Sequence, residues 1–197
     1  MYRLVTDYLE TSAQTNPNKI AFDDTKKKMS FRGCQQAAHR IATFLIEKAY
    51  FKSPIVVFLD KSVECISSFM GIAYSGNFYI PIDVKMPYPR IKKILSVLAP
   101  KAIITDFEHL DITENFSNDI PVFLYENMMQ HTINKELLQR TQESIIDTDI
   151  LYVLFTSGST GEPKGVIISH KSVIDYTEWV TETFHIDSAH IFANQAP

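Results

Sequence analysis

One run of eleven residues, FTSGSTGEPKG from Phe155 to Gly165, concentrates glycines, hydroxyl groups and one cation. The chain of 197 residues has only six glycines, and three of them, Gly158, Gly161 and Gly165, fall in this run. Glycine lets the backbone adopt positive φ angles, so several N–H groups can point at one anion. The run therefore has the composition of an anion-binding loop, and a polyphosphate such as ATP is its simplest target.

The side chains of the run favour the same chemistry. Lys164 supplies an ammonium group that suits a terminal phosphate as a point charge, and Pro163 stiffens the backbone beside it. A plain polar turn is the alternative, but a turn needs about two to five residues and no set of hydroxyl groups. We therefore interpret the run as a phosphate-binding loop. Its hydroxyl donors are Thr156, Ser157, Ser159 and Thr160.

The run differs from the two commonest phosphate loops. A Walker A loop opens a helix and places its lysine after the second glycine. Here Lys164 precedes Gly165, and β-branched stretches at 150–155 and 165–169 predict strands on both sides. The Rossmann pattern G-x-G-x-x-G does not occur. The run is thus expected to join two strands.

Strands and helices alternate along the rest of the chain. Short β-branched stretches are typical of buried strands, and apolar residues at helical spacing predict helices of about 10 to 15 residues between them. The pattern predicts an α/β fold, a wound β-sheet flanked by helices. Strands are predicted at 54–60, 77–83, 101–106, 121–126, 150–155, 165–169 and from 190, helices at 4–16, 30–45, 62–76, 87–100, 135–144 and 171–184, and a hairpin at 19–31.

Several single residues receive structural interpretations. The polar stretch 106–120 is predicted to be a surface loop. Trp179 stands at helical spacing from Tyr176 and is expected to pack. His170 follows the strand at 165–169 and is expected to be a capping or loop residue rather than a base. Asp83 is expected to lie in a turn or to cap a helix.

The composition excludes several function classes. The net charge is −4 and the basic residues are spread along the chain, so no nucleic-acid-binding face is expected. No segment reaches about 18 uninterrupted apolar residues, which excludes a membrane span. Residues 1–12 carry acids early and lack a long apolar run, so they are not interpreted as a signal peptide, and we expect a cytoplasmic protein. Cys34 and Cys65 are expected to be buried thiols. The six histidines show no metal spacing and no carboxylate cluster, so no metal site is predicted.

Three segments of the chain resemble one enzyme family. Residues 154–170, LFTSGSTGEPKGVIISH, resemble the signature phosphate loop of the adenylate-forming (AMP-binding) enzymes, and they match T-S-G-S/T-T-G-x-P-K-G at every position. Residues 29–45 resemble the first conserved helix entry of that family. Residues 71–95 resemble its segment K-A-G-x-x-Y-V/I-P-L/I-D-P-x-x-P-x-x-R, with Ser75 for alanine and Val84 for proline.

The resemblance implies that the protein binds ATP and Mg²⁺ and activates a carboxylate as an acyl-adenylate, with release of pyrophosphate. A phosphopantetheinyl carrier protein would then take the acyl group on its thiol. Lys164 would neutralise the β,γ end of ATP. The resemblance assigns no catalytic residue and no metal ligand within this chain. The residues implied to bind or shape the phosphate site are Thr156, Ser157, Gly158, Ser159, Thr160, Gly161, Lys164 and Gly165.

The resemblance also ranks the substrates. The form of the 71–95 segment favours the amino-acid-activating branch, and residues 176–197 resemble D-alanine–carrier protein ligases, so D-alanine is expected first. A peptide-synthetase adenylation domain for another amino acid comes next, and an acyl-CoA synthetase third. A nucleotide-binding module without chemistry is the alternative outside the enzymes.

The resemblance covers almost all of residues 1–197, but only the N-terminal portion of the large domain of these enzymes. The family's later motifs are missing: the substrate-pocket aspartate, the adenine-binding and ribose-binding segments, and the lid domain with its catalytic lysine. We therefore expect residues 1–197 to be a truncated adenylation domain that folds and does not catalyse the reaction alone.

Overall fold

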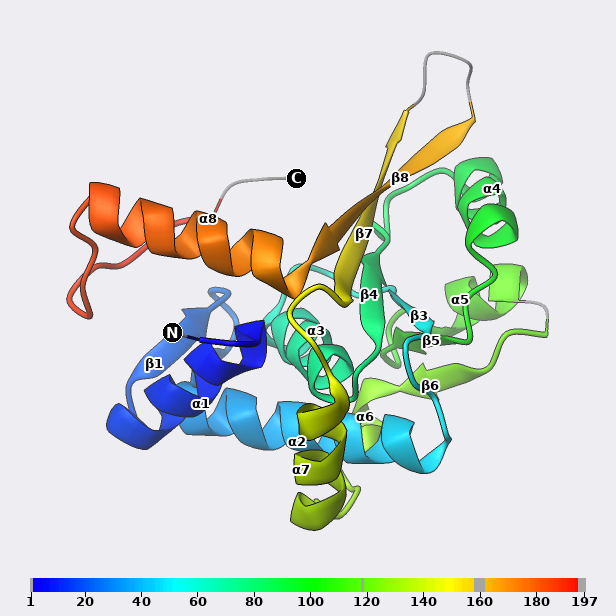
Figure 1. Ribbon diagram of the computed structural model, residues 1–197. Helices are drawn as coiled ribbons and strands as arrows, with labels where there is room; N and C mark the ends of the chain where they lie inside the picture. Colours follow the sequence, from blue (N-terminus) through cyan, green and yellow to red (C-terminus); the bar gives the residue numbers. More distant parts are fainter. Residues whose placement is uncertain (1, 118, 158–161, 195–197) are drawn as a thin grey trace.

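A six-stranded sheet organises the molecule (Figure 1). The computed structural model describes residues 2–117, 119–157 and 162–194. The strand order is β6-β5-β3-β4-β7-β8; neighbouring strands are parallel except β7 and β8, which are antiparallel. The predicted wound α/β sheet is confirmed. The strands are β3 (Pro54–Val57), β4 (Phe78–Pro81), β5 (Ala102–Thr105), β6 (Val122–Leu124), β7 (Ile150–Ser157) and β8 (Pro163–Ser169).

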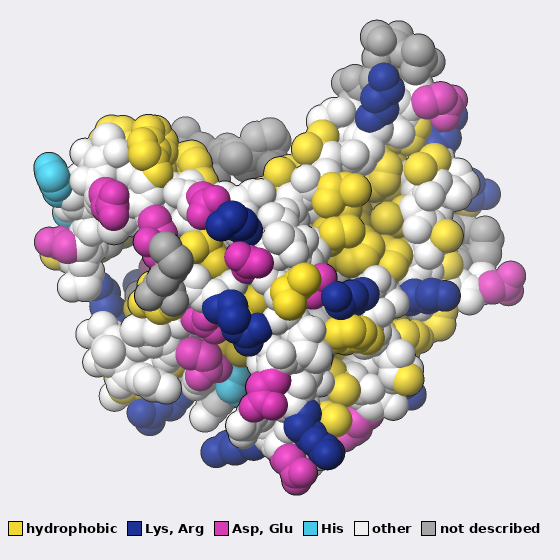
Figure 2. Space-filling model, in the orientation of Figure 1, with side chains coloured by type: hydrophobic (Ala, Val, Ile, Leu, Met, Phe, Trp, Pro, Cys, Tyr) yellow, Lys and Arg dark blue, Asp and Glu magenta, His cyan; other side chains and the backbone are white. Residues whose placement is uncertain are grey.

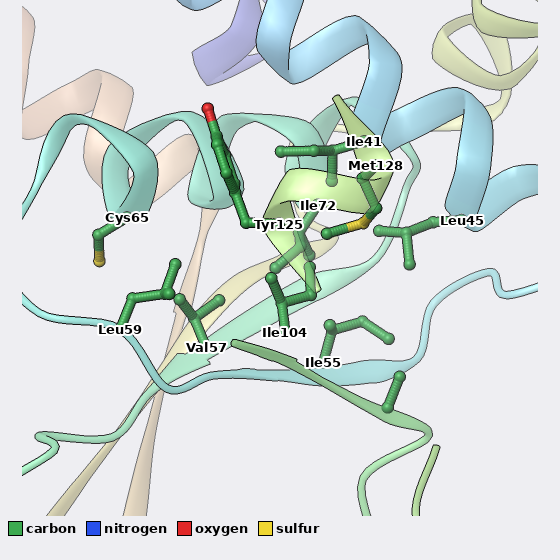
Figure 3. Packing of buried hydrophobic residues seen from close by; sticks show 11 residues of the cluster. Ile41, Leu45, Ile55, Val57, Leu59, Cys65, Ile72, Ile104, Tyr125 and Met128 are labelled. Carbon is green, nitrogen blue, oxygen red and sulfur yellow. The ribbon is translucent and has the colours of Figure 1, made fainter. Parts of the chain in front are cut away.

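Helices cover both faces of this sheet because successive strand residues point to opposite sides. In β3, Ile55 and Val57 pack under α2 (Phe31–Glu47), α3 (Val63–Tyr74) and α6 (Tyr125–Met128). Val56 packs on the other side, under α4 (Tyr88–Leu98) and α5 (Leu110–Ser117). Figure 3 shows the first of these cores, where side chains of α2, α3 and α6 converge on those of β3 and β5.

The remaining elements lie at the margins of the sheet. They include the predicted hairpin of β1 and β2, whose strands pair antiparallel. None of the helices in the described ranges is long and apolar enough to cross a membrane. These elements are α1 (Val5–Thr15), β1 (Ile20–Asp23), β2 (Lys28–Ser30), α7 (Lys135–Ser144) and α8 (His170–Thr183).

Two helices begin where the sequence predicted them, because a serine hydroxyl accepts a hydrogen bond from a free N–H of the first turn. Ser30 Oγ accepts from the N–H of Gly33 at 3.1 Å at the start of α2, and Ser62 Oγ accepts from the N–H of Cys65 at 3.2 Å at the start of α3. These two helices cross at Gly71, where an added Cβ would lie 2.6 Å from the Cβ of Ile41.

The surface loop predicted at 106–120 is wrong for part of its length, since α5 occupies Leu110–Ser117. The buried residues of this stretch are Thr113 and Phe116 on α5 and His109 just before it. Only Phe116 is strongly apolar, so the helical period gave no clear hydrophobic signal. Phe116 packs edge-on against Phe58 with ring centroids 5.1 Å apart, and this tertiary contact holds the helix in place.

Two expectations about the end of the chain are also wrong. Residues 190–194 form no strand. The side chain of Trp179 is 57% exposed instead of packed into a core. Its ring contacts only Tyr176 and Phe184 among the aromatic residues of the described chain, at centroid distances of 6.0 and 6.3 Å. The apolar spacing on α8 therefore marks an exposed stripe.

Candidate phosphate-binding hairpin

The strand–loop–strand arrangement predicted around the glycine-rich run is confirmed by β7 and β8. In the antiparallel register, Thr156 pairs with Lys164 and Ser157 pairs with Pro163 at the end of the hairpin. Both strands extend beyond the ends of their neighbours in the sheet (Figure 1). Four of the predicted site residues lie outside the described residues: Gly158, Ser159, Thr160 and Gly161.

The structure brings together two of the predicted site residues that it describes fully. Thr156 and Lys164 are directly opposite each other, and directly opposed residues of an antiparallel pair project from the same face. Thr156 Oγ1 lies 3.5 Å from the backbone oxygen of Lys164, and both residues are exposed. A hydroxyl donor and an ammonium group therefore stand side by side at the mouth of the loop.

Gly165, another predicted site residue, has a packing reason to be glycine. An added Cβ would lie 2.9 Å from Cγ1 of Val153 and 3.4 Å from Cζ of Phe155. Val153 belongs to the core beneath α4, and Phe155 packs against that core. The missing side chain of Gly165 thus lets these two β7 residues lie across β8, which ties the hairpin to the sheet.

The base of the hairpin is anchored on both faces of the sheet. Val153 anchors it on the α4 side. On the other face, Tyr152 stacks on Tyr79 with centroids 5.4 Å apart, and Tyr79 stacks on Phe69 of α3 at 4.3 Å. Aromatic stacks of this kind add to the free energy gained from burial. The base of the hairpin is therefore packed on both faces of the sheet, whereas Thr156 and Lys164, nearer the loop, are exposed.

Sequence reasoning missed an ion pair beside the loop. Lys93 Nζ of α4 lies 2.9 Å from a carboxylate oxygen of Glu162, the last residue before β8. The two residues are 69 positions apart, so no local pattern could have paired them. The contact holds the C-terminal side of the loop against α4.

The buried histidine after β8 belongs to α8, so the expectation of a capping or loop residue is wrong. Ser169 caps α8, and His170 is the first residue of the helix. His170 Nδ1 accepts a hydrogen bond from the N–H of Val5 at 3.2 Å. Burial lowers the pKa of His170 from 6.5 to about 4. The neutral ring therefore fastens α1 to the junction of β8 and α8, and it takes no place at the loop.

Asp83 and the two cysteines lie as the sequence predicted. Asp83 Oδ1 accepts the N–H of Lys85 at 2.8 Å, so Asp83 lies in a turn. Both cysteines are buried. Burial raises the pKa of the Cys34 thiol to about 12, and burial together with the charges of Asp60 and Glu64 does the same for Cys65. Neither thiol is a nucleophile near neutral pH.

The arrangement suits an anionic ligand. In open α/β sheets, ligands bind beyond the carboxyl ends of the parallel strands, and the loop follows the carboxyl end of β7. Hydroxyl and ammonium donors stand there without a neighbouring carboxylate among the described residues of β7 and β8. Glu162, between the loop and β8, is engaged by Lys93.

Comparisons with known proteins agree with this geometry. The family model described as AMP-binding enzyme matches residues 9–197. The D-alanine–D-alanyl carrier protein ligase of Lacticaseibacillus casei (strain BL23) is 28% identical over 189 residues, which are 96% of this chain and 37% of that protein. The chain therefore spans less than two fifths of the length of the curated relatives that it matches.

Solved structures share the fold. The AMPPNP-bound nonribosomal peptide synthetase FmoA3 superposes with a TM-score of 0.81 at 21% identity, covering 94% of this chain and 19% of that one. The fatty acid AMP ligase of Legionella pneumophila gives a TM-score of 0.77 at 23% identity, covering 94% of this chain and 34% of that one. One fold thus serves a peptide synthetase and a fatty acid ligase.

Proposed function

We propose, for a chain that belongs to the AMP-binding enzyme family, that the β7–β8 hairpin holds the phosphates of ATP while an amino acid carboxylate attacks the α-phosphate. The α–β phosphoanhydride bond breaks, and the products are an aminoacyl-adenylate and pyrophosphate. A carrier-protein thiol then receives the aminoacyl group. The observation that carries the proposal is the pairing of Thr156 with Lys164 on one exposed face beside a glycine-rich loop.

Within this proposal each part of the loop has a role. Lys164 neutralises the β,γ end of ATP, where negative charge collects when pyrophosphate leaves. Thr156 and Ser157 donate hydrogen bonds from β7. The proposed donors Ser159 and Thr160 and the loop-shaping glycines Gly158 and Gly161 follow from the sequence motif. Gly165 contributes through the close packing of Val153 and Phe155.

The described hairpin does not fit a magnesium-binding role of its own. Mg²⁺ in nucleotide sites is usually held by one or two carboxylates together with the substrate phosphates. Glu162 is the one acid among the described residues between 150 and 169. Lys93 holds it in an ion pair. No residue of this hairpin is therefore assigned to Mg²⁺.

D-alanine is the proposed substrate, and a carrier protein the proposed partner. The support is the name of the relatives that match most of this chain, the D-alanine–D-alanyl carrier protein ligases. Another amino acid, activated by a peptide-synthetase adenylation domain, is the second candidate, because the peptide synthetase FmoA3 shares the fold. A fatty acid is the third, because the Legionella fatty acid AMP ligase shares the fold as well. A nucleotide-binding module without chemistry is the fourth.

Nucleotide binding is tested first on this chain. Calorimetric titration with ATP and Mg²⁺ compares the wild type with Lys164→Ala and with the control Lys171→Ala, an exposed lysine of α8 whose ammonium lies 3.9 Å from Asp175. Lys164→Ala loses a charge-assisted hydrogen bond of about 1.5–3 kcal/mol, so it should bind ATP roughly 10- to 150-fold more weakly than the wild type. Lys171→Ala should bind ATP as the wild type does. Equal affinities for all three proteins would remove Lys164 from the site.

The chemistry is tested by ATP–pyrophosphate exchange with D-alanine, other amino acids and fatty acids. The product of the complete gene is assayed beside this chain. Exchange with D-alanine by the gene product and none by this chain is the expected result. Exchange with another amino acid would transfer the proposal to the second candidate, and exchange that needs a fatty acid would transfer it to the third. Nucleotide binding without exchange for any acid would favour the binding module.

A further inference from the structure

Three side chains that could hold a cation meet beyond the carboxyl ends of β3 and β5, outside the hairpin. Asp60 follows β3, and Glu108 and His109 precede α5. One ligand atom from each lies within 4.8 Å of the other two, and no other group of this kind occurs in the described ranges. The sequence prediction that no histidine joins a carboxylate cluster is therefore wrong. Asp60 lies 49 positions before His109 in the chain, and only the pairing of β3 with β5 joins them.

His109 is held in the orientation that a metal ligand requires. Its side chain is only 8% exposed, and its ring packs edge-on against Phe58 at 5.9 Å. Nδ1 lies 2.7 Å from Asp106 Oδ1. An ionised carboxylate only accepts hydrogen bonds, so the proton of the ring sits on Nδ1. A histidine ligand typically donates its second ring N–H to a carboxylate in this way.

The other ring nitrogen then carries a lone pair and lies near the carboxylate of Asp60. Nε2 of His109 lies 3.9 Å from Asp60 Oδ2, which is longer than a hydrogen bond. Within the described residues, the hydrogen bonds of this ring run through Nδ1 alone. Two neighbouring electron-pair donors are stabilised by a cation placed between them.

We propose that Asp60, Glu108 and His109 bind a divalent cation of the zinc class, with Asp106 as the positioning residue for His109. One imidazole and two carboxylates suit Zn²⁺, which takes three protein ligands and leaves a fourth position for water. Mg²⁺ prefers oxygen ligands alone. Tetrahedral ligand atoms at about 2.1 Å from Zn²⁺ lie roughly 3.4 Å apart, so binding draws the exposed Glu108 inward and fastens the segment after β3 to the start of α5.

The chain contains a matched pair of residues that serves as a control. Asp187 and His190 repeat the spacing of Asp106 and His109, with Nδ1 of His190 2.8 Å from Asp187 Oδ1. Both residues are exposed, and no third ligand joins them in the described part of the chain. The two sites differ in burial and in the added carboxylates, and Nδ1 of His190 also accepts a hydrogen bond from the backbone N–H of Asp187 at 3.1 Å.

The test is a calorimetric titration of this chain with Zn²⁺ in chelator-free buffer, with circular dichroism to confirm folding. We expect one Zn²⁺ per chain, and millimolar Mg²⁺ should not displace it. His109→Gln and Glu108→Gln each weaken binding at least tenfold. Asp106→Asn weakens it roughly 10- to 100-fold, because it frees the ring orientation. His190→Gln binds Zn²⁺ as the wild type does.

Several results would overturn the proposal. Wild-type protein without stoichiometric Zn²⁺ binding is one, and displacement of Zn²⁺ by Mg²⁺ is another. Equal Zn²⁺ affinity in the wild type and in Glu108→Gln is a third such result. Because Glu108 is exposed, this variant should fold and can be measured even where His109→Gln fails to fold. Loss of binding in His190→Gln would place the ion at the control pair instead.

Discussion

The parallel strands at the centre of the sheet and the β7–β8 hairpin are built from similar residues but have different surroundings. Ile104 in β5 is fully buried, whereas Ile167 in β8 is 62% exposed. Both residues are β-branched and lie in strands, so composition does not separate them. β5 has a strand on each side and helices on both faces, while β8 pairs only with β7. Stability is therefore expected to reside in the centre, and ligand binding at the projecting edge.

The space-filling view supports this contrast. Figure 2 shows apolar side chains gathered on the surface over the region of β4, β7 and β8. Leu154 and Val166, which are paired across the hairpin, are among the exposed apolar residues. Large exposed apolar patches mark surfaces that bind other groups. The hairpin thus combines a polar, donor-rich end with an apolar stem.

The largest expected effect is on the buried isoleucine. Ile104→Ala removes core contacts and should lower the free energy of unfolding by about 2–5 kcal/mol. Ile167→Ala removes an exposed side chain and should change it by about 0.5 kcal/mol or less. Urea unfolding of both variants beside the wild type measures the difference. Similar losses in the two variants would contradict the contrast between the two regions.

The second prediction concerns the junction of the regions at His170. Burial lowers its pKa from 6.5 to about 4, so the unfolded chain takes up a proton that the folded chain resists. The stabilisation from neutral His170 is complete above pH 6.5 and is lost as the pH falls toward 4, on the order of 3 kcal/mol.

This pH dependence is measured by urea unfolding between pH 7.5 and 4.5. His170→Gln serves as the reference, because it lacks the titrating group and keeps an oxygen that can accept the N–H of Val5. The difference in stability between the wild type and the variant should shrink as the pH falls. A constant difference would mean that His170 titrates alike in the folded and unfolded states.

The third prediction compares two glycines. At Gly71 a methyl group would meet Cβ of Ile41 at 2.6 Å and the backbone oxygen of Ala38 at 3.0 Å. These atoms cannot move separately from their helix, so Gly71→Ala should destabilise by about 1–3 kcal/mol. Gly165→Ala should cost less, because the atoms nearest the added methyl group belong to the side chains of Val153 and Phe155 and not to the backbone. Thermal unfolding of both variants ranks them, and the reverse order would contradict the packing argument.

The smallest effect is expected at the exposed ion pair beside the loop. Lys93 and Glu162 are 53% and 64% exposed at their side chains. Exposed pairs contribute about 0.2–1 kcal/mol, and salt screens them. Lys93→Gln should therefore change the free energy of unfolding by less than about 1 kcal/mol. A larger loss that persists in high salt would show that α4 and the loop form one cooperative unit.

Local patterns predicted much of the fold. The caps Ser30 and Ser62 lie within one turn of the N–H groups that they accept. The strand–loop–strand form of the phosphate loop followed from β-branched stretches on either side. Helix α5 was missed because two buried residues, Thr113 on the helix and His109 just before it, are polar. Their burial depends on distant residues, such as Thr105 of β5 and Phe58 after β3. Trp179 was misplaced because apolar spacing on a helix does not say whether another element covers it.

The amino acid sequence by itself determined the alternation of strands and helices, the caps, and the glycine-rich loop, since each depends on residues within a few positions of one another. Tertiary structure alone decided which side chains meet across the sheet. It placed Thr156 opposite Lys164, joined Lys93 to Glu162, and brought Asp60 to His109. The physical reason is that strand order and register set these distances, and both arise from the burial of the whole sheet.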